Sequence, residues 1–119
     1  MAHLVALITD RELAAELAAA AEAAGHDVDV CTGEADAWKA CEQRTELLVV
    51  DISSDSIDGV TLVDSMRAGG ELQGVRTLAF HGDADHAATA RAAEVGFDLV
   101  VPRSQMRADG AQLIAGLLA

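Results

Sequence analysis

The stretch of sequence that decides the fold is Leu47-Leu48-Val49-Val50-Asp51-Ile52-Ser53-Ser54-Asp55-Ser56-Ile57-Asp58-Gly59. Four consecutive apolar residues are typical of a strand covered on both faces, as in a parallel sheet. The run ends at the carboxylate of Asp51 and opens into a polar loop. In open α/β sheets, ligand chemistry collects just beyond the carboxyl ends of strands, so Asp51 is the first candidate functional residue. The alternative is that Asp51 is only a turn former or a helix cap.

On either side of this stretch, short apolar runs alternate with amphipathic stretches along the whole chain. The expected strands are Leu4–Ile8, Asp27–Cys31, Leu47–Val50, Val75–Phe80 and Leu99–Val101. The expected helices are Arg11–Ala24, Glu34–Gln43, Gly59–Ala68, His86–Val95 and a last one through Leu113, Ile114 and Leu117. Strands separated by single helices imply right-handed crossovers, so the order predicts an α/β fold, (βα)5, with one doubly wound five-stranded parallel sheet. A length of 119 residues fits a single domain, 1–119.

Charge and composition restrict the classes of function. The chain has 8 Lys and Arg against 20 Asp and Glu, a formal net charge of −12, which disfavours nucleic-acid binding. No stretch approaches the roughly 18 apolar residues of a membrane span, and no basic segment precedes a long apolar one, so a cytoplasmic location is expected. Cys31 and Cys41 lack partners at metal-ligand spacing and are interpreted as buried, reduced thiols.

The segment from Leu48 to Leu62 resembles the receiver domains of two-component response regulators. Asp51 resembles their phosphoacceptor, and Asp58-Gly59 resembles the Asp-Gly that opens their third helix. Weaker similarities lie at Gly25-His26, Gly33 to Trp38 and Ala93 to Asp98, so the resemblance covers the whole chain. It implies a flavodoxin-like, doubly wound fold and a role in signal transduction.

The departures from this family concern its chemistry. The resemblance implies an acidic pair for Mg²⁺ after the first strand, a Ser or Thr after the fourth and a Lys after the fifth. Gap-free placement puts Ile8 and Thr9 at the pair, His81 at the hydroxyl position and Arg103 at the lysine position. Only Asp51 keeps the type that the family implies. Val100 likewise replaces the aromatic residue of the fifth strand.

The segment after the first strand has two interpretations. Ile8 offers no oxygen, and Thr9 with Glu12 has the spacing of a helix capping box, in which Thr9 is the cap. Asp10 is then expected in the first helical turn, where the macrodipole favours a carboxylate. The alternative is that a one-residue bulge brings Asp10 towards Asp51. An ion, if any, would then contact Asp10, Asp51 and the carbonyl of Ser53.

His81 and Arg103 place nitrogen donors where the family has a small hydroxyl and a lysine. Either could bond Asp51 and keep it paired without metal. The alternative places both side chains in solvent.

These observations favour a degenerate, or pseudo-, receiver that is not an enzyme, needs no cofactor and works through protein–protein contacts. The implied partner is a signalling protein, a histidine kinase or a fused effector domain, contacted through the fourth helix, fifth strand and fifth helix; a homodimer through that face is an alternative. The alternative function is a working receiver that takes phosphate on Asp51 from a histidine kinase with an unusual Mg²⁺ site. A flavodoxin-like nucleotide-binding domain is disfavoured, because no Gly-rich phosphate loop follows the first strand.

Overall fold

The computed structural model describes residues 2–53 and 58–118, and these alternate strand and helix as the sequence predicts. The elements are β1 (His3–Leu7), α1 (Arg11–Ala23), β2 (Asp27–Cys31), α2 (Glu34–Ala40), β3 (Leu47–Asp51), α3 (Gly59–Ala68), β4 (Arg76–His81), α4 (His86–Val95), β5 (Leu99–Pro102) and α5 (Arg103–Leu118). The largest difference from expectation is α2, which ends at Ala40 and not at Gln43. The amides of Glu42 and Gln43 bond carbonyls three residues back, which tightens the chain into a turn.

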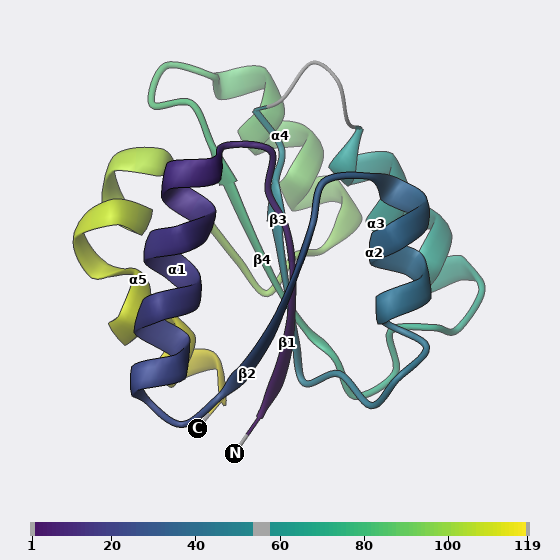
Figure 1. Cartoon of the computed structure of the whole chain (residues 1–119). Coiled ribbons are helices and arrows are strands. Elements are labelled where there is room, and N and C mark those ends of the chain that lie inside the picture. Colours follow the sequence, from purple (N-terminus) through teal and green to yellow (C-terminus); the bar gives the residue numbers. More distant parts are fainter. Residues whose placement is uncertain (1, 54–57, 119) are drawn as a thin grey trace.

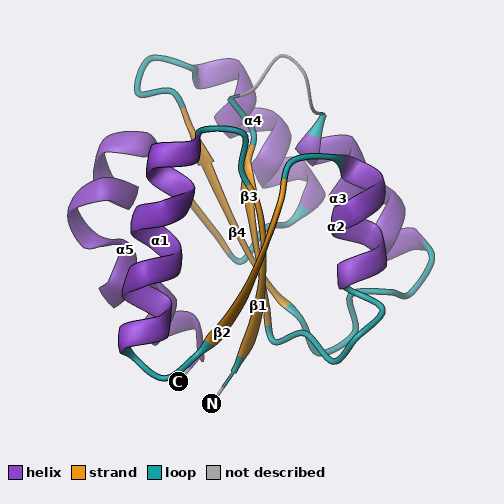
Figure 2. Ribbon diagram, in the orientation of Figure 1, coloured by secondary structure: helices purple, strands orange, loops and turns teal. Residues whose placement is uncertain are grey.

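All five strands are parallel and lie in the order β2-β1-β3-β4-β5 (Figures 1 and 2). Helices α1 and α5 cover one face of the sheet, and α2, α3 and α4 cover the other. Strand β2 lies on one side of β1, and β3, β4 and β5 follow in order on the other side. The strand order therefore reverses between β1 and β3, and their carboxyl ends mark the position where doubly wound folds place their sites.

The core consists of two apolar layers, one on each face of the sheet. Alternate residues of the strands point to opposite faces, so Leu4 and Ala6 join the layer under α1 and α5, while Val5 and Leu7 join the other. The buried residues of the expected strands include Leu4, Ala6, Ile8, Leu48, Val50, Leu78, Phe80 and Val101. Leu99 is only partly buried because β5 is an edge strand.

The sole tryptophan and both cysteines belong to the layer under α2. Trp38 is half-buried against that layer. Cys31 and Cys41 are free, buried thiols, and burial raises the pKa of Cys41 to about 11. This confirms the interpretation of the cysteines as packing residues.

The start of α3 is fixed by Asp58 and Gly59. The carboxylate of Asp58 caps the helix by accepting from the backbone N–H of Thr61. Gly59 packs so closely on β3 that a Cβ there would collide with Cγ1 of Val50. The Asp-Gly pair therefore sets where the chain returns after Asp51. Across residues 2–53 and 58–118, no helix combines the length and apolar character needed to cross a membrane.

Candidate functional site

The candidate site lies where the loops after β1, β3, β4 and β5 meet, at the upper end of the sheet in Figure 1. Asp51, the last residue of β3, is the buried carboxylate of this site, with an exposed fraction of 2%. Its Oδ1 accepts from the backbone N–H of Ser53 at 2.9 Å and from the Ser53 hydroxyl at 2.5 Å. Its Oδ2 accepts from Arg103, so both oxygens are satisfied within the protein.

Arg103 is the first residue of α5 and connects three of the loops. Its Nη2 donates to Asp51 Oδ2 at 3.0 Å and to the Ser53 hydroxyl at 3.1 Å, while its Nη1 donates to Asp10 Oδ2 at 3.1 Å. The guanidinium also lies 5.9 Å from the ring centroid of Phe80, within the range of a cation–π contact. A planar fork of donors is suited to this arrangement, because each nitrogen can serve a different carboxylate.

Asp10 has a different position from the one preferred from the sequence. It is the N-cap of α1, not a residue of the first turn: its Oδ1 accepts from the backbone N–H groups of Glu12 and Leu13. Its Oδ2 remains available for Arg103, with Arg107 at 3.5 Å. The N–H of Leu13 and the charge of Arg103 hold the pKa of Asp10 below its usual value, against the effect of partial burial.

The capping box predicted for Thr9 and Glu12 is therefore wrong. Helix α1 begins at Arg11, one residue later than a Thr9 cap requires, and the Asp10 carboxylate is the better acceptor for two first-turn amides. Ile8 is buried in the core, and its backbone N–H bonds the carbonyl of Cys31. The side chain of Ile8 offers no oxygen to the site.

His81 is buried but does not reach Asp51. Its Nδ1–H donates to the carbonyl of Gly82 at 2.7 Å, and its Nε2 pairs with the Thr89 hydroxyl of α4 at 3.1 Å. Both ring nitrogens are thereby used within the β4–α4 region. Of the two donors expected near Asp51, the structure brings Arg103 to it and leaves His81 tied to α4, and neither side chain lies free in solvent.

Two contributors were missed from the sequence. Asp83, in the loop after β4, accepts from the backbone N–H of Ser104 and so caps α5 directly beside Arg103. That N–H lowers the pKa of Asp83. Arg107 is one helical turn beyond Arg103, and this four-residue spacing was the available signal, because such residues lie on one face of a helix. No such local signal marks Asp83.

Among the described residues, the groups gathered around the guanidinium of Arg103 include three carboxylates and the hydroxyl of Ser53. Asp10, Asp51 and Asp83 all lie near Arg103, and the first two accept its hydrogen bonds. Within the described part of the chain, no three His, Cys, Asp or Glu side chains form a group suited to holding a metal. The arrangement is an ion-pair network at the carboxyl ends of the strands.

Comparison with solved structures identifies the fold as that of response-regulator receiver domains. The receiver domain of the TMAO respiratory system response regulator TorR matches with a TM-score of 0.87 and 20% identity, over 99% of this chain and 97% of that chain. The chemotaxis response regulator CheY4 of Vibrio cholerae matches at 0.86 and 13%, over 99% of each. A CheY-like receiver domain protein from Methanospirillum hungatei matches at 0.84 and 16%, over 99% and 94%. No protein-family model and no curated protein matches the sequence.

Proposed function

We propose that this chain is a receiver-like signalling module that binds another protein without being phosphorylated, and that Arg103 holds its phosphoacceptor position closed. The observation that carries the proposal is the contact of one guanidinium with both Asp10 and Asp51. Asp51 stands at the position of the receiver phosphoacceptor, and Arg103 donates to the oxygen that the Ser53 donors leave available.

The energetics favour a closed site. Asp51 is buried, so its charge needs a partner, and Arg103 supplies one that is covalently part of the chain. An incoming phosphoryl group would have to displace this cation and leave its own negative oxygens beside Asp10. Phosphoryl transfer needs positive charge to offset those oxygens, and in receivers Mg²⁺ has that role.

The residues present do not fit Mg²⁺ while Arg103 is in place. Mg²⁺ requires near-octahedral oxygen ligands at about 2.0–2.1 Å. Among the described side chains, the carboxylate oxygens that could face it, Oδ2 of Asp10 and Oδ2 of Asp51, are both bound to the guanidinium, and Ile8 adds no oxygen. No step of the proposed function therefore passes through a metal, and the module is proposed to be neither an enzyme nor dependent on a cofactor.

The proposed partner is another signalling protein, such as a histidine kinase or a fused effector domain. The proposed location of this contact is the cytoplasm. The face formed by α4, β5 and α5 is the proposed contact. In its support, β5 is an edge strand on which Leu99 and Val100 remain partly exposed. A second copy of the chain on the same face is the alternative. Since Arg103 begins α5 and is fixed to β3, this surface would be held in one arrangement.

A working receiver is the second candidate, and one observation favours it. The carboxylates of Asp10 and Asp51 both pair with the guanidinium of Arg103, at 3.1 Å and 3.0 Å. If Arg103 swung towards solvent, two carboxylates and the Ser53 backbone would face the loop. In that case Asp51 would accept phosphate with Mg²⁺ held by an unusual set of ligands.

Incubation with a small phosphodonor and millimolar Mg²⁺ separates the two candidates. The wild-type chain, Arg103→Ala and Asp51→Asn are compared for acid-labile phosphate by intact mass and for amide shifts with beryllofluoride. We expect no phosphate and no shift around residue 51 in the wild type. Phosphate that forms on the wild type and is lost in Asp51→Asn establishes the working receiver. Phosphate only on Arg103→Ala identifies Arg103 as the element that closes the site.

A further inference from the structure

The free edge of strand β2 is the most exposed part of the sheet. The amide of Asp27 donates to the carbonyl of Ala2, and the carbonyl of Cys31 accepts from Ile8, so alternate residues of β2 direct their backbone groups to β1. The backbone groups of Val28 and Val30 point the other way. Since β2 ends the sheet, no described strand pairs with them.

Strand β2 has apolar side chains on one face of the sheet and acidic side chains on the other. Val28 and Val30 pair with Leu4 and Ala6 of β1 and share the α1 side of the sheet, whereas Asp27 and Asp29 lie on the α2 side. Val30 is 42% exposed and is the one exposed large apolar side chain among the described residues. The edge is therefore apolar on one side and acidic on the other.

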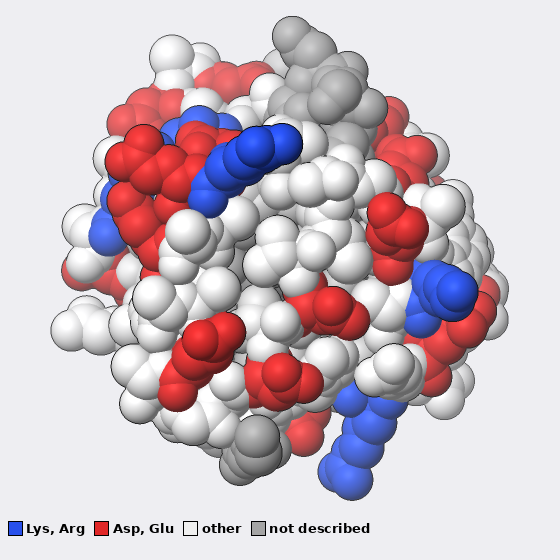
Figure 3. Space-filling model, viewed as in Figure 1, with Lys and Arg blue, Asp and Glu red and all other residues white. Residues whose placement is uncertain are grey.

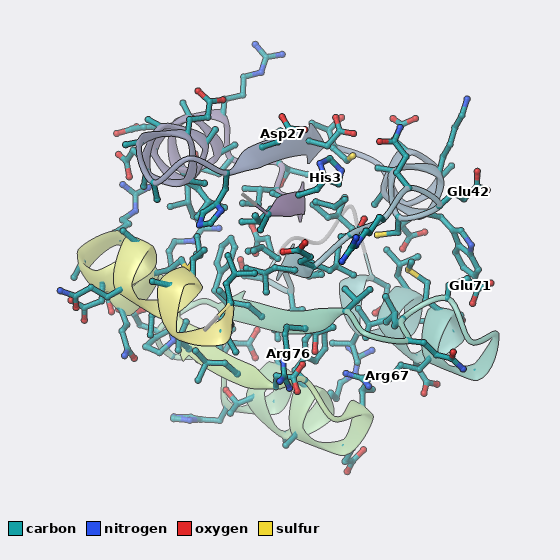
Figure 4. All side chains as sticks on the ribbon, turned by 90° about the horizontal axis from the view of Figure 1, so that it is seen from below. His3, Asp27, Glu42, Arg67, Glu71 and Arg76 are labelled. Carbon is teal, nitrogen blue, oxygen red and sulfur yellow. The ribbon has the colours of Figure 1, made fainter. Side chains whose placement is uncertain are left out.

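A groove of about 340 Å³ extends the acidic side. It lies between the free edge and α2 and is lined by Asp29, Val30, Cys31, Thr32, Asp36, Lys39, Ala40 and Gln43. Asp27 is bonded to His3 Nδ1 at 3.1 Å (Figure 4), but Asp29 and Asp36 have no ion-pair partner in the described structure. Figure 3 shows the side of the molecule on which β2 lies in front. Acidic side chains lie near the centre of this view, and basic side chains lie towards its margins. Lys39 is the single cation among the groove residues.

From this geometry we infer that the β2 edge is a docking site for an extended segment of another protein in which basic and apolar residues alternate. A strand added to the edge would bond the outward N–H and C=O groups of Val28 and Val30. Period-two alternation would then place its apolar side chains beside the two valines and its basic ones beside Asp29 and Asp36. This site is independent of Asp51 and of the face proposed for signalling partners.

A second copy of the chain fits the edge poorly. Pairing β2 with β2 would bring Asp27 and Asp29 of the two copies together, and each copy has a net charge of −12. The same acidic residues also oppose edge-to-edge aggregation, which is a common use of charges on edge strands. If the acidic residues only prevent aggregation, a peptide with alternating basic and apolar residues should bind no better than another peptide of equal charge. If the edge is a docking site, the alternating peptide should bind better.

The test uses a capped peptide, Lys-Val-Lys-Val-Lys-Val, and a control of the same composition, Lys-Lys-Lys-Val-Val-Val. Hydrogen exchange of the full chain is followed by NMR at low ionic strength. The alternating peptide should slow exchange of the Val28 and Val30 amides, while the Asp27 amide is already protected in the free protein. No protection at these two amides, or equal protection by the control peptide, overturns the proposal. The proposal is also overturned if the Val28 and Val30 amides are protected without peptide and the chain sediments as a dimer. That result would identify a second copy of the chain as the occupant.

Two variants outside the Asp51 site sharpen the result. Asp29→Asn should weaken binding of the alternating peptide by about two- to fivefold, as expected for loss of an exposed ion pair. Lys39→Gln should strengthen it by a similar factor because a like charge is removed. Unchanged affinity for the alternating peptide in both variants would show that the acidic side of the edge does not contact the basic residues of the peptide. That result would overturn the assignment of ligand chemistry.

Discussion

Arg103 is the residue on which the site depends most, because it pairs with a carboxylate that has almost no access to water. Its side chain is 32% exposed and that of Asp51 is 2% exposed, so the pair lies between a surface and a buried ion pair. Exposed pairs contribute little to stability, whereas removing one partner of a buried pair leaves a costly unpaired charge. The contact is therefore expected to matter more to stability than the exposure of Arg103 alone suggests.

Arg103→Ala should lower the free energy of unfolding by about 1 to 3 kcal/mol, between the values for exposed and buried pairs. Asp51→Asn added to Arg103→Ala should recover most of that loss, because no buried charge is then left unpaired. Urea denaturation of the four members of the cycle gives the coupling energy. Arg107→Ala is the matched control: its contacts are longer, 3.5 Å and 3.9 Å, so a change within about 0.5 kcal/mol is expected. A loss as large in Arg107→Ala would contradict a special role for Arg103.

Stability should fall in acid because several carboxylates are bonded as anions in the folded state. The pKa values of Asp10, Asp58 and Asp83 are lowered from 3.8, chiefly by backbone N–H groups of Leu13, Thr61 and Ser104. Between each lowered folded pKa and 3.8 the unfolded chain binds more protons, so this stabilisation is complete above pH 3.8 and is lost as the pH falls through the folded values. Urea midpoints from pH 2 to 6 measure the effect. A triple Asp→Asn variant should show a flatter profile, and an unchanged slope would contradict this origin.

The packing of α3 on β3 depends on Gly59, because a Cβ at this position would collide with Cγ1 of Val50. Gly59 opens α3 directly against Val50, while Asp58 caps the helix and bonds Arg91 of α4 at 3.2 Å. The element that carries Asp51 and the helix that follows it are thereby held in fixed register. The Asp-Gly pair noticed in the sequence thus has a packing role as well as a capping role.

Gly59→Ala should destabilise the protein by about 1 to 3 kcal/mol, because the new methyl group must displace Val50. Gly82→Ala is the control, since a Cβ at residue 82 would meet no atom within 4 Å and its φ is not positive. Thermal unfolding of both variants provides the measurement. Equal melting temperatures for the two variants would show that α3 has room to move away from β3.

The sheet as a unit rests on strand residues that are buried on both faces. Every residue of β3 is buried, since α1 and α5 cover one face and α2, α3 and α4 cover the other. The two edge strands differ from it: β2 exposes most of its residues and β5 leaves Leu99 and Val100 partly exposed. Burial is therefore concentrated in the centre of the sheet, and the two edge strands are the part of the sheet that solvent reaches.

Leu48→Ala should cost about 2 to 5 kcal/mol of unfolding free energy, because it leaves a cavity in a fully buried strand. Val30→Ala on the exposed edge should cost less than about 1 kcal/mol. Guanidinium denaturation, followed by the fluorescence of half-buried Trp38, compares the two. A similar loss in both variants would mean that β2 is as tightly packed as β3, contrary to the burial of its residues.

Periodicity along the chain was sufficient to predict the (βα)5 order and the parallel sheet, because apolar runs and amphipathic stretches report local structure and burial. It also placed Asp51 at the end of a buried strand, while the resemblance to receiver domains put Ile8, which has no side-chain oxygen, at a position where that family has an acidic residue. The contact between Arg103 and Asp51 was one of two alternatives. The capping box on Thr9 was wrong, since Asp10 is the N-cap of α1. For His81 the sequence left contact with Asp51 and exposure to solvent as alternatives, and the structure shows a third arrangement, with its ring bound to Gly82 and Thr89.

The network around Asp51 depended on folding because its members are distant in sequence: Arg103 lies 93 positions from Asp10 and 52 from Asp51. Which donor reaches a carboxylate depends on how each loop turns after its strand. His81 turns towards Thr89, whereas the side chain of Arg103, at the start of α5, reaches Asp10 after β1 and Asp51 at the end of β3. Local propensity carries no information about these directions, since they follow from the packing of α4 and α5 on opposite faces of the sheet.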